Sequence, residues 1–350
     1  MEPTAPPRPV SPAMRDALRE RVDVRGRMRF DAFVETVLYH PELGYYRHRS
    51  PRVGRGADTD FYTSESLGPV FGRLIAEAAE ALLPPALPLK KTIFLEIGAE
   101  AGRHVLDGVD HRFSGTMTVA VGTPLEIPKR AVVFSNELFD AQPFRRFVRT
   151  DSGWRERGVV LMEGGVAECL LTPGGPTPDG LPDEAPAGYC VDLPTGAVAL
   201  AESIAARPWS GLFLAIDYGK TRRALFTEHP EGTARAYHRH RQESDLLARA
   251  GQQDLTCHIC WDDLEDALRA HRFDHLRLER QEAFLMRHAH AAVQAILSGD
   301  TGGVGAARRK VMELIHPQYF GARFQVLSAL RTPPDTLRKT VDPAHPAACA

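Results

Sequence analysis

The stretch TIFLEIGAEAG, residues 92–102, combines a short apolar run with a turn that contains Gly98 and Gly102. Such a run is typical of a buried β-strand, and glycines directly after a strand let the backbone come close to a ligand. A helix is expected after this turn, because N–H groups at a helix N-terminus favour the polar end of a nucleotide-type ligand. Taken alone, the motif is equally typical of a tight structural turn, and that interpretation is favoured until other motifs are considered.

Three more apolar runs end in a glycine or a polar residue. They are MTVAV before Gly122, AVVFS before Asn136 and LFLAI before Asp217. Strands buried in a parallel sheet show such runs, and ligands of open α/β sheets bind outside the carboxyl ends of the strands. Together with the first run, they predict an α/β fold with a Rossmann-like sheet.

Further elements follow from the spacing of apolar residues. Helices are predicted over residues 30–38, 71–82, 196–206 and 261–270. The runs on either side of Ser152–Gly153 predict a hairpin, and two later stretches, 254–261 and 278–286, are interpreted as strands.

The segment SNELFDA, residues 135–141, places Asn136, Glu137 and Asp140 just after an apolar strand. Polar groups buried at such a point need partners, and a bound ligand is one candidate. A helix N-cap formed by the serine or asparagine explains the pattern equally well. Both interpretations stay open on these residues alone.

Composition limits the class of protein. The chain has 350 residues, a formal net charge of −2 and five cysteines. The charge gives no basic field for nucleic acid, and an odd, sparse set of cysteines is unlike a secreted disulfide framework. No apolar run reaches the roughly 18 residues of a membrane span, and the start of the chain lacks the apolar core of a signal peptide. We expect a cytoplasmic protein with no nucleic-acid or membrane partner.

Two other patterns are weaker. Cys257 and Cys260 form a C-x-x-C, but no second pair at zinc spacing follows, so we expect no metal site. The HRHR run at 238–241 is interpreted as a solvated basic stretch, with a place along a substrate cleft as the alternative.

Several segments, in order along the chain, resemble one family, the MidA-type methyltransferases, which are related to the mitochondrial complex I assembly-factor arginine methyltransferase. The segments are FVETVLYHPELGYY, DFYTSESLGPVFG, FLEIGAEAG, SNELFDAQPFRRF, AIDYG, EGTARAYHRH, GQQDLTCHI and QEAFL. The resemblance implies a class I fold, S-adenosylmethionine as cofactor and a protein as methyl acceptor, with arginine as a candidate acceptor residue. An N-terminal helical lobe and C-terminal α+β insertions would accompany the sheet.

The resemblance also implies roles for particular residues. Catalysis would rest on Asn136, Glu137 and Asp140, with Asn136 and Glu137 near the reacting methyl group. Cofactor binding would involve Asp60, Thr63, Glu96, Gly98 and Gly102. Because a guanidinium is a poor nucleophile while protonated, a carboxylate such as Glu137 would orient it and stabilise its positive charge.

Three features depart from the family. Glu100 replaces the middle glycine of the glycine-rich turn, and Gly122 stands where an acid would bind the ribose hydroxyls. Only about nine residues lead from Gly122 to the next strand, too few for the family's helix and strand, since a helix alone averages about eleven. We therefore expect a sheet without one edge strand and its helix.

The chain is expected to divide into a flexible tail over 1–28, a helical lobe over 29–88, a methyltransferase-like domain with a substrate-lobe insertion over 89–331, and a flexible tail over 332–350. Two functions remain. One is a methyltransferase with a protein substrate, and the other is a degenerate scaffold that binds a partner without catalysis. A Rossmann enzyme using another nucleotide is a weaker third alternative, and a homodimer is left open.

Overall fold

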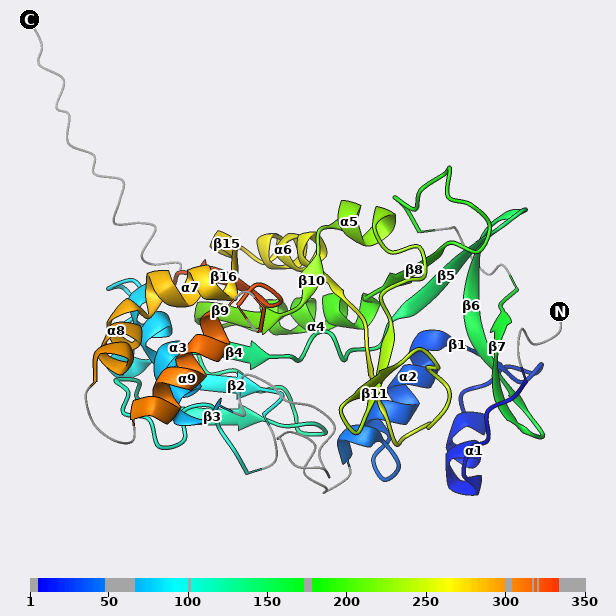
Figure 1. Ribbon diagram of the computed structural model, residues 1–350, viewed down its shortest axis with the longest axis horizontal. Helices are drawn as coiled ribbons and strands as arrows, with labels where there is room; N and C mark the ends of the chain where they lie inside the picture. The colour runs from blue at the N-terminus through cyan, green and yellow to red at the C-terminus, as the bar shows by residue number, and fades with distance from the viewer. Residues whose placement is uncertain are drawn as a thin grey trace, which may run out of the picture.

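The computed structural model describes residues 6–47, 67–99, 102–172, 178–299, 304–316, 318–319 and 321–333. Figure 1 shows two sheets at opposite ends of an elongated molecule, with small strands and loops between them. The first sheet has the order β15-β16-β9-β4-β2-β3, and the second has the order β1-β6-β5-β8, with β7 beside β6.

The first sheet is a mixed sheet with a parallel core. Its strands are β2 (Ile93–Ile97), β3 (Gly115–Val119), β4 (Arg130–Asn136), β9 (Ser210–Asp217), β15 (Asp274–Arg280) and β16 (Gln325–Arg331). Strands β3, β2, β4 and β9 run parallel, and β16 and β15 are antiparallel additions. The four predicted runs are therefore neighbours, and their carboxyl ends meet at one edge, as the Rossmann-like interpretation requires.

Strand β3 lies at the edge of this sheet. Residues 120–129, all described, contain neither helix nor strand between β3 and β4. The expected absence of one edge strand and its helix is thus confirmed, because the ten residues that cross from β3 to β4 are too few to hold both.

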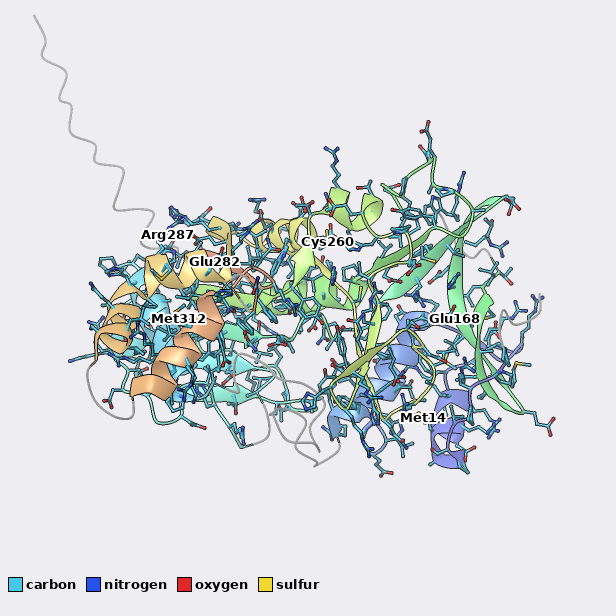
Figure 2. The ribbon with its side chains drawn as sticks, viewed as in Figure 1. Met14, Glu168, Cys260, Glu282, Arg287 and Met312 are labelled. Atoms are coloured by element: carbon cyan, nitrogen blue, oxygen red, sulfur yellow. The ribbon has the colours of Figure 1, made fainter. Side chains whose placement is uncertain are left out.

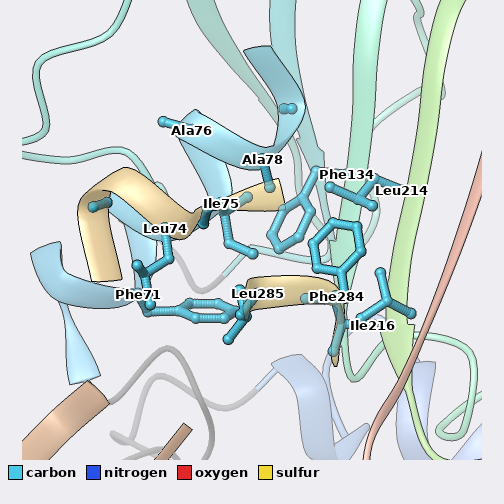
Figure 3. Close-up of a cluster of buried hydrophobic side chains, with 14 of the residues drawn as sticks. Phe71, Leu74, Ile75, Ala76, Ala78, Phe134, Leu214, Ile216, Phe284 and Leu285 are labelled. Carbon is cyan, nitrogen blue, oxygen red and sulfur yellow. The ribbon is translucent and has the colours of Figure 1, made fainter. Parts of the chain in front are cut away.

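Helices cover both faces of the first sheet. One face carries α3 (Pro69–Leu82), α7 (Gln281–His288), α8 (His290–Ser298) and α9 (Val304–Ile315). Figure 3 shows Phe71 and Ile75 from α3 packing with Phe284 from α7 over Phe134 and Leu214 of the strands. The other face carries α4 (Thr195–Ala206) and α6 (Trp261–Ala270). Both helices were predicted from the spacing of apolar residues.

The second sheet consists of β1 (Arg27–Arg29), β5 (Arg145–Thr150), β6 (Gly153–Met162), β7 (Gly165–Leu170) and β8 (Cys190–Leu193). The predicted hairpin is β5–β6, which pairs antiparallel. Helices α1 (Pro12–Arg19) and α2 (Phe30–Tyr39) share a buried cluster with this sheet. The N-terminal helices α2 and α3 therefore pack on different sheets.

Short elements connect the two sheets. They are η1 (Tyr45–Arg47), β10 (Gly219–Lys220), α5 (Arg222–Thr227), β11 (Arg235–His238), β12 (Arg241–Glu243), β13 (Asp254–Thr256) and β14 (Ile259–Cys260), whereas η3 (Leu89–Lys91) leads from α3 into β2. The HRHR run spans the end of β11 and its turn into β12. These elements close a cavity over the carboxyl edge of the first sheet.

Three expectations about local structure were wrong. Residues 12–19, placed in a flexible tail, form α1, because Ser11 caps it and Met14 and Leu18 are buried. Residues 281–286, interpreted as part of a strand, begin α7, because Phe284 and Leu285 pack against α3. No helix follows the glycine-rich turn in residues 102–114, which form turns and bends instead. A tail over 332–350 remains a prediction, since nearly all of it lies outside the described residues.

Candidate active site

A cavity of about 1760 Å³ lies at the carboxyl ends of β4 and β9. Its wall includes Glu137 and Asp140 after β4, Tyr218 after β9, and residues of α9 such as Met312. Figure 2 marks Met312 on the side of α9, with the elements that connect the two sheets across from it. Asn136 directly precedes this wall and is 7% exposed. The structure thus brings the three predicted catalytic residues together.

The backbone of Glu137 is in the left-handed region, with φ of 51°. Its N–H donates to the carbonyl of Ile216 at 2.9 Å, and Asn136 Nδ2 donates to Glu137 Oε1 at 3.2 Å. A non-glycine residue held in this region is strained, and such strain concentrates at functional sites. The turn therefore presents a carboxylate at the cavity wall at a cost to stability.

Asp217, the last residue of β9, holds this turn in place. Its Oδ2 accepts the N–H of Phe139 at 2.9 Å and of Asp140 at 3.3 Å, and its Oδ1 accepts the N–H of Tyr218 at 2.9 Å. Burial raises the pKa of Asp217 to about 7, although these three N–H groups favour its charged form. Through these hydrogen bonds, the buried Asp217 holds the β4 turn that carries the candidate catalytic residues.

Asp140 is 4% exposed, and burial together with the nearby Asp217 raises its pKa well above the usual value. Its Oδ1 has no hydrogen-bond partner among the described residues. The same is true of the Oδ1 of Asn136. Buried acceptors of this kind are rare without a reason, and a bound ligand is one. Both atoms lie at the exit of β4, where the sequence left a bound ligand and a helix N-cap as equal alternatives.

The site has polar members that the sequence analysis did not single out. Tyr46 donates from its hydroxyl to Asp254 Oδ1 at 2.8 Å, and burial raises its pKa well above the usual value. His258 lies on the cavity wall, and burial lowers its pKa to about 4, so its ring is neutral near pH 7. Asp217, Asp254 and His258 belong to the segments AIDYG and GQQDLTCHI, so the resemblance was a signal for them.

The glycine-rich turn lies at the end of the neighbouring strand β2. Glu96 is 1% exposed, and its Oε2 accepts the N–H of Val105 at 2.6 Å. Gly98 has φ of 86°, and a Cβ there would lie 2.8 Å from Leu138 Cδ1. Gly102 has φ of 73° and no heavy atom within 4 Å of such a Cβ. Both positions require glycine for their backbone conformation, as predicted for a close approach. Gly98 lies against Leu138 of the β4 turn, and the cavity wall described above includes none of these three residues.

Three positions of interest lie outside the described residues: Asp60 and Thr63, predicted to bind the cofactor, and Glu100 of the glycine-rich turn. Their roles remain predictions.

At the end of β3, where an acid would bind ribose, a basic side chain is present. Arg47 donates from Nη1 to the carbonyl of Val121 at 2.8 Å and from Nε to that of Pro41 at 3.1 Å. A Cβ at Gly122, which has φ of 79°, would lie 2.1 Å from Arg47 Nη1. The missing ribose acid was predicted, but the arginine beside Gly122 was not.

The two cysteines of the C-x-x-C are buried and free. Burial raises the pKa of both thiols, which fits the packing role expected for them. Within the described residues no group of His, Cys, Asp and Glu has the arrangement of a metal site. Nor does any helix there have the length and apolar character needed to span a bilayer.

The parallel core, the glycine turn and the polar exit of β4 define a Rossmann-like fold of the methyltransferase class. Residues 117–277, a little less than half of the chain, match the family described as "Putative S-adenosyl-L-methionine-dependent methyltransferase".

Two solved structures from Burkholderia thailandensis are similar over nearly the whole chain. The first is a COG1565 superfamily member bound to S-adenosyl-homocysteine, with 24% identity, a TM-score of 0.78, and coverage of 93% of this chain and 95% of that one. The second is a native COG1565 superfamily protein with 23% identity, a TM-score of 0.71 and the same coverage. At sequence identities this low, the structural similarity shows a shared fold only. Together with the family match, it confirms the resemblance to a methyltransferase family predicted from motif order.

Proposed function

We propose that this protein is an S-adenosylmethionine-dependent methyltransferase whose acceptor is a protein side chain, with arginine as the first candidate. The observation that carries the proposal is the strained turn after β4, which presents the Glu137 carboxylate at the wall of a large cavity beside the glycine turn. The cavity is large enough for a side chain of another protein. The family match and the methyltransferase fold support the reaction class.

The residues at the methionine end suit the cofactor. Among the described residues Asn136 Oδ1 is a buried acceptor without a partner, and an ammonium group is a suitable donor for it. Gly98 and Gly102 let the backbone approach closely. At the ribose end, Arg47 stands in place of an acid, so the ribose would have to be bound through other groups. The described residues therefore suit the methionine end of the cofactor but not its ribose.

The bound cofactor would supply an electrophilic methyl group. Glu137 would accept hydrogen bonds from the guanidinium of an arginine acceptor and stabilise its charge. This contact would turn one terminal nitrogen towards the methyl group, and orientation of this kind supplies much of the rate in such transfers. Tyr46 and Asp254, which are hydrogen-bonded on the cavity wall, would limit how the acceptor side chain can lie.

Calorimetric titration of the full-length protein with S-adenosylmethionine and S-adenosylhomocysteine tests the proposal. We expect micromolar binding of both, with tighter binding in a Glu100→Gly variant because the acidic side chain is removed from the glycine turn. An Asn136→Ala variant should bind about tenfold more weakly, since a hydrogen bond to a charged group contributes roughly 1.5–3 kcal/mol. An exposed Asp110→Ala variant is the control. No binding by any form would contradict the proposal.

A scaffold without catalysis is the second candidate, and Arg47 favours it. Its guanidinium is bonded to two carbonyls at the end of β3, so the cation beside Gly122 is part of the fold. Absence of cofactor binding in both the native protein and the Glu100→Gly variant would support the scaffold. Radiolabelled methyl transfer to any protein acceptor would exclude it.

A further inference from the structure

The cavity has two chemically different sides. Glu137, Asp140 and Asp254 lie on the side of the sheet and connecting strands. Four arginines lie on the side of the helices, from three adjoining parts of the fold: the residue before α7, helix α9, and the turn before β16. They are Arg280, Arg308, Arg309 and Arg323. Glu313 of α9 is an acid on the same side. Helix α7 packs against both α9 and β16, so these parts form one wall.

None of these four guanidinium groups forms an ion pair with a carboxylate in the part of the chain that the structure describes. Arginines elsewhere contrast with them. Arg145 pairs with Glu156 at 2.7 Å, Arg249 with Glu243 at 2.7 Å, and Arg222 with Asp263 at 2.5 Å. The four arginines outnumber Glu313 on their side of the cavity, so this wall carries an excess of positive charge that an anionic partner would neutralise. The wall is therefore suited to anionic groups of a ligand.

Apolar side chains lie among these arginines. Met312 is 43% exposed and Tyr319 is 58% exposed, and both line the cavity. Large exposed apolar side chains beside charged ones are typical of surfaces that bind polypeptides. The carboxylates on the opposite side would repel a nucleic-acid backbone, which carries only negative charge. A polypeptide with a basic residue followed or preceded by anionic residues matches both sides.

We propose that the wall formed by Arg280, Arg308, Arg309 and Arg323 binds an acidic segment of the protein substrate, next to the basic side chain that enters between Glu137 and Asp254. This inference rests on the proposed function, since it names the class of polypeptide that the site accepts. The anionic groups are carboxylates or phosphates, and a guanidinium binds either through two parallel hydrogen bonds. The wall would thus select acceptors by the charge of their neighbouring residues.

Binding of fluorescent peptides to the full-length protein, followed by anisotropy, tests this inference. Three probes share one central arginine and differ in four flanking residues, which are Glu, phosphoserine or Ser. We expect the Glu and phosphoserine peptides to bind at least about tenfold more tightly than the Ser peptide, with the advantage falling at high salt. The ratio between the Glu and phosphoserine probes identifies which anion the wall prefers.

The decisive variant is Arg308→Glu with Arg309→Glu, and its control is Arg25→Glu with Arg277→Glu. The control changes the net charge equally at two exposed arginines that do not line the cavity. We expect the first variant to lose the preference for acidic peptides and the control to keep it. Circular dichroism and cofactor titration show whether each variant is folded.

Equal binding of the Ser and Glu peptides, or equal loss in both variants, would overturn the inference, as would tighter binding of a single-stranded RNA oligonucleotide of the same charge. The cofactor titration is independent of these results. A protein that binds cofactor but shows no preference for acidic peptides would retain the proposed function and lose the acidic-segment inference. A protein that prefers acidic peptides but binds no cofactor would retain the acidic-segment inference and lose the proposed function.

Discussion

At the scale of single residues, the site depends on conformations and charges that are unfavourable by themselves. Glu137 has a left-handed backbone, Asp140 and Asp217 are buried acids with raised pKa values, and the carbonyl oxygen of Asn136 finds no hydrogen-bond donor in the part of the chain that the structure describes. Each costs stability, and each lies at the carboxyl edge of β4 or β9. Such a concentration is typical of an active site.

A Glu137→Gly substitution tests the strain directly. Glycine adopts φ of 51° without a steric penalty, so we expect the free energy of unfolding to hold or to rise by up to about 1 kcal/mol. Methyl transfer to a protein acceptor should be lost, because the carboxylate is removed. Urea denaturation measures the first effect and radiolabel incorporation the second. A fall of 2 kcal/mol or so in stability would show that Glu137 has a structural role instead.

At the scale of elements, a buried arginine joins three strands of the second sheet. Arg146 of β5 is 7% exposed, and it forms ion pairs with Asp192 of β8 and Glu168 of β7, both at 2.8 Å. Asp192 also accepts the N–H groups of Thr233 and Ala234 at 2.7 Å. The arginine therefore links the second sheet to the connecting segment that leads into β11.

Truncation of this arginine should be costly. An Arg146→Ala substitution leaves Asp192 buried without its cation, so we expect the free energy of unfolding to fall by about 3–5 kcal/mol. Arg145 on the same strand is a matched control, because its pair with Glu156 is partly exposed. Arg145→Ala should cost about 1 kcal/mol or less. Urea denaturation of both variants measures the difference, and equal effects would refute this account of Asp192.

At the scale of the whole molecule, the cavity wall gathers residues that are far apart in the chain. His258 is surrounded by groups from other segments: its ring contacts those of Tyr218 and His229 edge to face, both at 5.4 Å between centroids. Burial, followed by the charge of His229 and the nearby Lys220, lowers its pKa to about 4. Its Nδ1 has no hydrogen-bond partner among the described residues.

This environment predicts a pH dependence of stability. A histidine with a lowered folded-state pKa takes up a proton on unfolding, so its contribution is present above the unfolded pKa of about 6.5 and is lost as the pH falls towards 4. We expect a His258→Gln variant to lose less stability than the native protein between pH 6.5 and 4.5, by about 1–3 kcal/mol. Asp217, whose pKa is raised to about 7, acts in the opposite direction over this whole range in both proteins, so the difference between them isolates His258. Parallel slopes in urea denaturation would contradict this assignment.

Much of the fold and part of the site could be predicted from the sequence. Apolar runs that end in glycine or polar residues located β2, β3, β4 and β9, because burial on both faces leaves a local signal. The missing edge strand followed from the length of one connection. Asn136, Glu137 and Asp140 were proposed because the family resemblance decided between the ligand and N-cap interpretations that the residues alone left open.

Tertiary structure alone decided the rest. Helix α7 replaced an expected strand because Phe284 and Leu285 pack against α3, and its Gln, Glu, Ala, Leu, Met and Arg residues favour a helix, which the alternating apolar pattern had obscured. Arg47 reached Gly122, and Asp217 reached the β4 turn, through contacts between residues far apart in the sequence, which no local pattern records. The four cavity arginines come from three segments and became one wall only when α7, α9 and β16 packed together. The sequence by itself determined where strands end and which polar groups follow them, whereas packing decided which of those groups meet.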